Sequence, residues 1–257
     1  MTDVFIFQTA LKDYLSPRRF WIWVVLGIAV AAMARAWVGS GAMESREVVY
    51  GQVSSMLVFR LLALASALFT TAIISQEVEQ KTIAYVLTRP VERWRFLFAR
   101  FVASVLASFL VGAVLAAALS LGVYGADGFR YTPFWNDLKA MFFGAWAYGG
   151  LFLFLSLILN RAMIVCLLYA FGIETITPNM PGESGFLAIA TYVEAIAQHQ
   201  TPMDTSNPLG FLTRSMGLNT TSPGTGVTVL VLFSIAAVVL ALMWFSRFEY
   251  VPREDAE

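Results

Sequence analysis

The stretch SQEVEQKTIAYVLTRPVERWRFLFAR, from Ser75 to Arg100, decides how the rest of the chain is interpreted. It is a long polar interruption between two apolar runs, Val53–Ile74 and Phe96–Val123, and it holds five of the seventeen Lys and Arg residues. Within it, Thr82–Leu87 predicts a short helical turn, which Pro90 ends because the residue before a proline disfavours the helical conformation. This pattern indicates a short helix at a membrane surface that contacts a soluble partner. An ordinary basic loop that only fixes topology is the alternative.

The composition of the whole chain indicates a membrane protein. Of its 257 residues, 58% are hydrophobic and 13% are charged, whereas soluble domains carry roughly a quarter charged residues. The zero net charge gives no reason to expect nucleic acid as a partner. The single cysteine, Cys166, excludes an intrachain disulfide framework. We therefore expect an all-α polytopic protein whose residues 1–257 form one transmembrane domain in a lipid bilayer.

Apolar runs of about 20 residues, the length that crosses the hydrocarbon layer, predict the transmembrane helices. Six are expected: Phe20–Val38, Val53–Ile74, Phe96–Tyr124, Ala140–Leu159, Ala162–Ile176 and Val227–Phe245. Residues 1–19 precede them with a helical alternation of apolar and polar side chains that ends at Ser16-Pro17. This pattern predicts an interfacial elbow helix. In the third expected span, small residues recur every four positions and predict close helix packing: Ser104, Ser108, Gly112, Ala116 and Ser120.

The distribution of basic residues predicts the orientation in the membrane. Six spans place both termini on one side, where eleven Lys and Arg residues lie, against four on the other side. The positive-inside rule then places both termini and residues 75–96 in the cytoplasm. Residues 178–224 would lie outside, as two short helices at Gly185–Gln198 and Pro208–Gly217 that are re-entrant or interfacial.

Three titratable residues within or near the expected spans are candidates for function. Arg60 lies inside the second span, where a charge is costly and so is usually paired or functional, although an outer anchor is an equal alternative. Glu174, at the outer end of the fifth span, is a hypothetical partner for Arg60 in an intramembrane pair or pathway. His199 is the only histidine and has no metal-ligand spacing around it, so we expect it in a solvated external loop and expect no metal site.

Catalytic motifs are absent from the sequence. It contains no G-x-x-x-x-G-K-[ST] phosphate loop, no G-x-S-x-G elbow and no H-E-x-x-H motif. We therefore predict that the chain is not itself an enzyme, and we assign no catalytic residue.

The quoted stretch resembles the loop between spans two and three in permeases of type-2 ATP-binding-cassette (ABC) exporters, where an E-x-E-x-x-T pattern precedes L-x-x-P-V-x-R. The resemblance implies a coupling helix that binds a separate ATPase subunit, with these residues at matching positions: Glu77, Glu79, Thr82, Arg89, Pro90 and Arg93. Lys81 departs from the glycine that is frequent before the threonine. The elbow helix and a broken helical hairpin before the last span are also similar to this family.

The resemblance also implies how the complex is assembled. Two permease copies, or one copy and a homologue, would form the substrate pathway in a bacterial or archaeal cytoplasmic membrane. Two ATPase subunits would bind below them and hold ATP and Mg, so that this chain carries no cofactor.

Two other functions remain open from the sequence. An ion-gradient-driven secondary transporter would need polar breaks at mid-membrane and internal repeats, of which no convincing pair is found between the halves. A non-transporting membrane anchor would use the Ser75–Arg100 segment only to recruit a soluble partner. Stimulation of ATPase activity by a transported compound separates the exporter from the anchor, and dependence on a proton or sodium gradient indicates the secondary transporter.

Overall fold

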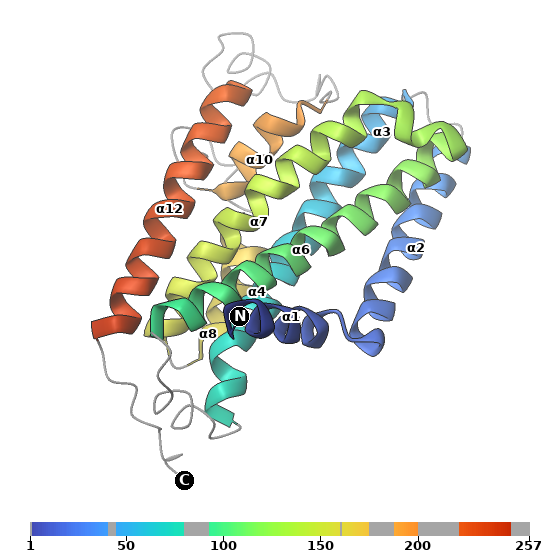
Figure 1. Cartoon of the computed structure of the whole chain (residues 1–257). Helices are drawn as coiled ribbons and strands as arrows, with labels where there is room; N and C mark the ends of the chain where they lie inside the picture. The colour runs from blue at the N-terminus through green and yellow to red at the C-terminus, as the bar shows by residue number, and fades with distance from the viewer. Residues whose placement is uncertain are drawn as a thin grey trace.

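The computed structural model describes residues 2–40, 45–79, 93–159, 161–174, 188–199 and 221–247. Within these ranges the chain is helical, as Figure 1 shows. The helices in chain order are α1 (Thr2–Tyr14), α2 (Pro17–Gly39), α3 (Arg46–Val53), η1 (Ser54–Val58), α4 (Phe59–Glu79), α6 (Arg93–Tyr124), η2 (Gly125–Arg130), α7 (Thr132–Ile158), α8 (Ala162–Leu168), η3 (Tyr169–Ile173), α10 (Ile189–Ala197) and α12 (Pro223–Arg247).

Five helical runs in the described part of the chain are long and apolar enough to cross a membrane: Pro17–Gly39, Arg46–Ile74, Trp94–Arg130, Thr132–Ile158 and Pro223–Arg247. They correspond to five of the six expected spans and confirm an all-helical polytopic architecture. The remaining expected span, Ala162–Ile176, appears as the shorter apolar helix Ala162–Ile173. At 1.5 Å per residue, its twelve residues reach about 18 Å, well short of the roughly 30 Å of hydrocarbon.

Local sequence signals explain where the long helices begin. Pro17 and Pro133 stand in the first turns of α2 and α7, where a proline costs no hydrogen bond because the first N–H groups have no helical partner. Ser45 caps α3 by accepting a hydrogen bond from the Val48 N–H at 3.4 Å. Ser222 caps α12 in the same way through the Thr225 N–H at 3.2 Å. These signals set the starts of the helices.

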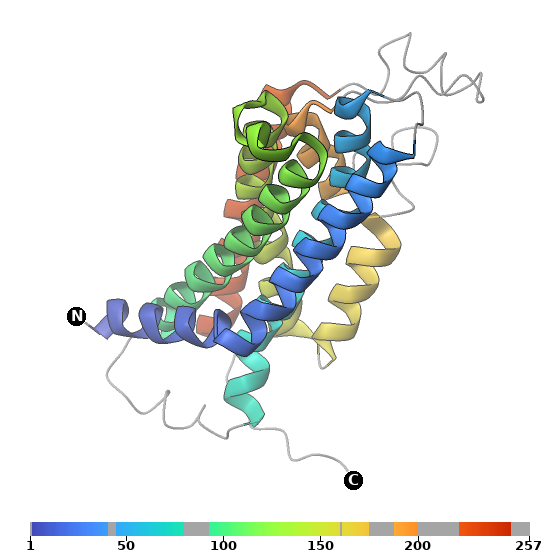
Figure 2. The same cartoon turned by 90° about the vertical axis from the view of Figure 1, so that its right-hand side faces the viewer.

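The first helix, α1, runs across the direction of the long helices, as Figures 1 and 2 show. Its inner face buries Ala10 and Tyr14, and the Tyr14 ring lies 5.6 Å from that of Phe69 on α4. Its outer face carries Phe5, which is 71% exposed. The helix expected within residues 1–19 is therefore present, and its place at the membrane interface stays a prediction.

The core lies where α4, α6 and α7 pack against one another. All five small residues of the repeating face on α6 are buried. A Cβ atom added at Gly112 would lie 3.0 Å from Leu62 Cδ1 and 3.2 Å from Met141 Sδ, so a small residue is needed for α4 and α7 to approach α6. Close approach through small residues is a usual way for helices to associate in lipid.

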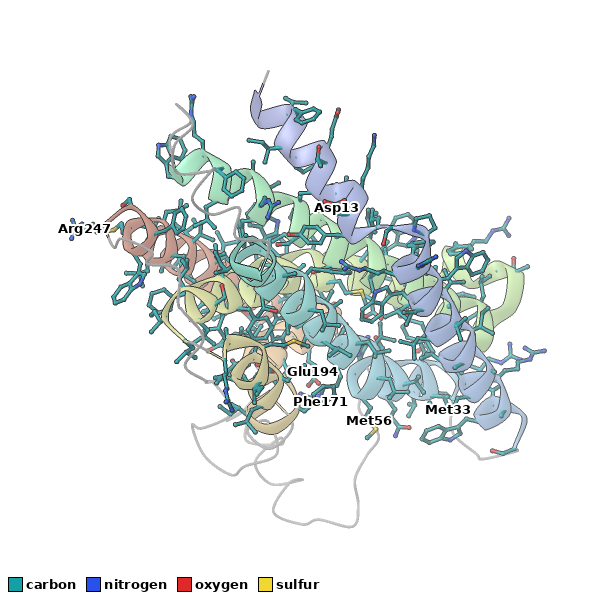
Figure 3. The ribbon with its side chains drawn as sticks, turned by 90° about the horizontal axis from the view of Figure 1, so that it is seen from below. Asp13, Met33, Met56, Phe171, Glu194 and Arg247 are labelled. Carbon is teal, nitrogen blue, oxygen red and sulfur yellow. The ribbon has the colours of Figure 1, made fainter. Side chains whose placement is uncertain are left out.

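One side of the bundle presents large apolar side chains outward. Met33 on α2, Met56 on η1 and Phe171 on η3 lie along this side in Figure 3. They are 42%, 65% and 52% exposed, respectively. Large exposed apolar side chains on a transmembrane bundle contact lipid or another protein.

Two differences from the sequence expectations concern the ends of elements. The fourth span begins at Thr132 instead of Ala140, so Asp137 lies inside α7 and not in the preceding loop. Of the two short helices expected within residues 178–224, the first appears as α10, and the second, Pro208–Gly217, lies outside the described residues. The turn expected at Thr82–Leu87 also lies outside them.

Candidate functional site: two buried carboxylates at the ends of α10

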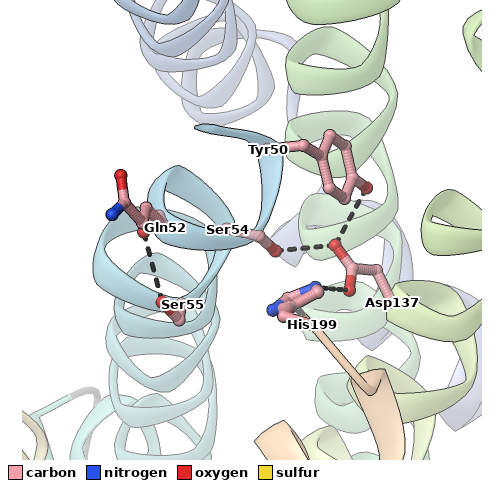
Figure 4. Close-up of polar contacts among 6 residues, drawn as sticks. All are labelled: Tyr50, Gln52, Ser54, Ser55, Asp137 and His199. Carbon is pink, nitrogen blue, oxygen red and sulfur yellow. Dashed lines mark hydrogen bonds and ion pairs between the residues drawn. The ribbon is translucent and has the colours of Figure 1, made fainter. Parts of the chain in front are cut away.

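Asp137 is the centre of a buried polar cluster formed by Tyr50, Ser54, Asp137 and His199, which we call the Asp137 cluster. Its side chain is fully buried. The Tyr50 hydroxyl donates to Oδ2 at 2.9 Å, and the Ser54 hydroxyl donates to the same oxygen at 2.6 Å. His199 Nε2 lies 2.6 Å from Oδ1. Figure 4 shows these groups converging on one carboxylate from three separate elements, α3–η1, α7 and the end of α10.

The Asp137 cluster brings three hydrogen-bonding groups to the two carboxyl oxygens of Asp137. A carboxylate only accepts hydrogen bonds, and both hydroxyl groups can donate to it. The remaining oxygen accepts a hydrogen bond from the His199 tautomer that carries hydrogen on Nε2. A buried carboxylate is tolerated when several donors satisfy it. Because the partners of Asp137 come from three elements, the cluster holds these elements together.

His199 is packed into the protein, so the expectation of a solvated loop is wrong. Its side chain is only 8% exposed. The ring stacks on Phe59 with centroids 5.6 Å apart and planes 14° from parallel, and it meets the Tyr50 ring edge-on at 6.1 Å. The physical reason is the left-handed backbone of Gln198, at φ 54°, which ends α10 and directs the next residue toward α7.

A pocket of about 210 Å³ opens beside the cluster. It is lined by Glu47, Thr132, Pro133, Asn136, Ala197, Gln198 and His199. Among the described residues, no group of three His, Cys, Asp or Glu side chains is placed to hold a metal ion. The arrangement therefore joins helices; it does not form a recognisable metal centre.

Glu174 forms a second buried carboxylate site, at the other end of α10. Its fully buried side chain accepts hydrogen bonds from the N–H of Ile189 at 3.0 Å and from the N–H of Ala190 at 2.8 Å. The Tyr148 hydroxyl donates to Oε2 at 3.0 Å, and the Tyr169 hydroxyl also contacts the carboxylate. Glu174 therefore caps the N-terminus of α10, where free N–H groups and the helix dipole both favour a negative charge.

The Asp137 cluster and the Glu174 site each hold one end of α10 against α7. Tyr148 lies eleven residues after Asp137 on α7, which corresponds to about 16 Å of helix. The helix α10 covers the same interval in the opposite direction, from the Glu174 site to His199. Glu174 thus lies beside the middle of α7, whereas the sequence placed it at the outer end of a span.

Arg60 lies in the first turn of α4 and is partly buried. Its charge acts on the Tyr148 hydroxyl, so it is close to the Glu174 site. Within the described part of the chain, Arg60 and Glu174 form no ion pair, and Arg60 Nη1 has no hydrogen-bond partner. The functional pairing of these two residues stays a hypothesis.

The predicted ATPase-contact residues are only partly covered by the structure. Glu77 and Glu79 belong to the last turn of α4, and Arg93 is the first residue of α6. Thr82, Arg89 and Pro90 lie outside the described residues. Their predicted role is therefore untested.

Sequence reasoning missed Asp137 and its partners Tyr50 and Ser54, as well as Tyr148. One signal was available: Asp137 and Glu174 are the only acidic residues between Asp127 and Glu183. Two isolated acids that flank a long apolar stretch are candidates for buried, hydrogen-bonded carboxylates.

Comparison with known proteins agrees with the resemblance described for the Ser75–Arg100 stretch. A search of curated proteins finds no match. The family model described as ABC-2 family transporter protein matches residues 17–176, which run from the start of α2 to just past η3 and cover more than half of the chain. The chain therefore belongs to the ABC-2 family of transporter proteins, as an integral membrane permease.

Proposed function

We propose that the chain is the permease subunit of an ABC exporter, which forms a substrate pathway as a dimer and is driven by a separate ATPase subunit. The observation that carries this proposal is the family match over residues 17–176, which includes the whole segment that joins α4 to α6. Members of this family form the transmembrane component and generally work with an ATPase.

The position of the joining segment supports an ATPase contact there. The helices α4 and α6 pack along each other, and Arg100 Nη1 donates to the Ile73 carbonyl at 3.4 Å, so the two helix ends are tied together. These ends lie on the same side of the bundle as α1 in Figure 2. The excess of basic residues places this side in the cytoplasm, where ATP is available.

The short helices support a total of six crossings, with the fifth one broken. The run α8–η3 rises from the α7 C-terminus to the level of Tyr148, and α10 continues from that level to Asp137. Their lengths of about 18 Å and about 14 Å, for twelve and nine residues, together match the roughly 30 Å of hydrocarbon. A broken helix at membrane depth is tolerated where it is packed on protein, as α10 is on α7 and α12.

The apolar side that carries Met33, Met56 and Phe171 is our candidate for the contact with the second permease copy. It is formed by α2 and η1 together with η3, which belongs to the broken crossing. The substrate pathway would then run between the two copies along this side.

The experiment that tests the proposal is purification from detergent of the native chain and of a Glu77→Arg, Glu79→Arg double variant. We expect an ATPase with Walker motifs to co-purify with the native chain and to be lost with the variant. A Glu47→Arg, Asp127→Arg double variant is the matched control, because it reverses two acids at the opposite end of the bundle. The absence of any ATPase with the native chain would contradict the proposal.

A further inference from the structure

The helix α10 fills a groove whose walls are α4, α7 and α12. Val193 packs over Gly144 of α7, where an added Cβ atom would lie 3.1 Å from Val193 and 3.4 Å from Leu62 of α4. On the other side, a Cβ atom added at Gly226 of α12 would lie 3.0 Å from the Tyr192 carbonyl oxygen. At these two points α10 is closely packed against α7 and α12.

The Asp137 cluster is the polar connection between this end of α10 and the helix that leads to the joining segment. Tyr50 and Ser54 belong to a continuous helical run, α3–η1–α4, that ends at Glu79, where the segment begins. Phe59 of the same run stacks on His199. A displacement at the cytoplasmic end of α4 would act directly on both contacts, because a helix transmits force along its axis.

Each carboxylate site lies directly beside a π-helical turn. Ser54 is the first residue of η1, and Glu174 follows immediately after η3. Single π-turns within α-helices often mark functional positions. If η1 became α-helix, its turn would hold fewer residues. Each residue that leaves the turn would rotate Tyr50 and Ser54 by about 100° about the axis of α4, away from Asp137. Such a conversion would break the Asp137 cluster.

We propose that the Asp137 cluster is a latch that holds the C-terminal end of α10 against η1 until α4 moves. Tyr50, Ser54 and His199 are positioning residues in this latch, and Asp137 is its common acceptor. The inference rests on the proposed function for the force that opens the latch. The closed state itself can be tested without the ATPase.

The test measures how fast a thiol at the C-terminal end of α10 reacts. Cys166 is the only cysteine, so Cys166→Ala gives a background without thiols, and Ala197→Cys introduces one at a position that is 1% exposed and lines the pocket. The full chain, in lipid nanodiscs, is treated with a membrane-impermeant maleimide. Ala126→Cys, at an exposed position of η2 away from the pocket, is the control thiol that reacts in every variant.

Breaking one hydrogen bond of the latch should expose the thiol. We expect Ser54→Ala to raise the labelling rate at position 197 by about tenfold, because a hydrogen bond to a charged group shifts an opening equilibrium by about this factor or more. Tyr50→Phe should give a similar increase and provides a second variant of unchanged shape. Ser55→Ala is the matched control: the Ser55 hydroxyl donates only to the Gln52 carbonyl, at 3.2 Å, and faces away from the cluster in Figure 4.

The outcomes separate the latch from the proposed function. The latch would be overturned if the thiol at position 197 reacted at the same rate in Ser54→Ala, in Ser55→Ala and with the native cluster. So would an increase in all variants, Ser55→Ala included. In the complex with its ATPase, ATP with vanadate should speed labelling of the native cluster, and no change in an actively hydrolysing complex would overturn the coupling to α4. If no ATPase co-purifies, the proposed function fails, while the labelling result still decides the closed state.

Discussion

Replacement of Glu174 by glutamine tests how strongly the proposed broken crossing, α8–η3 followed by α10, depends on one carboxylate. The glutamine side chain keeps the size of Glu174 but has only one oxygen that can accept hydrogen bonds. In the structure Oε1 accepts from the Ile189 N–H, and Oε2 accepts from the Ala190 N–H and the Tyr148 hydroxyl. The Glu174→Gln variant therefore leaves at least one buried N–H group of α10 without an acceptor.

The cost follows from two contributions. A buried donor without a partner costs about 1–3 kcal/mol. Loss of the negative charge at the N-terminus of α10 removes about 0.3–1 kcal/mol more. We therefore expect the local opening of α10 to become easier by about 1–4 kcal/mol, which corresponds to roughly tenfold to 1,000-fold faster amide exchange when reclosing is faster than the intrinsic exchange.

Hydrogen–deuterium exchange with mass spectrometry measures this effect directly. The peptide that covers residues 188–199 should exchange faster in Glu174→Gln, whereas peptides from α12 beyond Leu230 should stay unchanged. Tyr148→Phe should give a smaller acceleration of the same peptide, because it removes one donor and leaves both N–H groups bonded. Unchanged exchange of residues 188–199 in Glu174→Gln would refute the reasoning that this carboxylate holds α10.

Three further predictions concern packing and charge. Gly226→Ala should lower the melting temperature in detergent, by the equivalent of about 1–3 kcal/mol, because its Cβ atom would lie 3.0 Å from the Tyr192 carbonyl oxygen. Gly224→Ala, with no atom within 4 Å of its Cβ, should be neutral or stabilising by about 0.5–1 kcal/mol, and equal effects of the two would contradict this packing. Gly122→Ala should also destabilise, since its Cβ atom would lie 2.6 Å from the Ala31 carbonyl oxygen, whereas Gly39→Ala, with free space, serves as its control in the same melting assay. Arg60→Met should affect thermal stability less than Glu174→Gln, because Arg60 makes no ion pair with Glu174 in the described structure; a larger loss would support the pair instead.

The long helices could be predicted from the sequence because each signal is local. Hydrophobic length determines a span, and Pro17 lies close to where the first one begins. The small-residue face of α6 could also be predicted, since residues four positions apart lie on the same side of a helix. The sequence also indicates that the fifth span is short, because Pro178 and Pro181 follow closely after Ile176.

The candidate site could not be predicted because its contacts join distant parts of the chain. The Tyr50 hydroxyl and Asp137 are 87 residues apart in sequence, and His199 and Asp137 are 62 residues apart. Glu174 was recognised as important, yet Arg60 was proposed as its partner. The N–H groups of α10 satisfy the carboxylate instead, and no sequence pattern showed that this helix begins there. The predicted contact of Glu77 and Glu79 with an ATPase stays a prediction.

The shortness of α8–η3 has a consequence for how the protein is made. The insertion machinery admits segments to the bilayer by their apolar length, and twelve residues that end at an acidic side chain are a poor substrate for it. Glu174 loses its unfavourable exposure to lipid only when the N–H groups of α10 and the Tyr148 hydroxyl reach it. In the proposed six-crossing arrangement, the fifth crossing is therefore completed after the flanking helices have entered the membrane. A substitution at Glu174 would then appear first as poor biogenesis and early degradation of the protein.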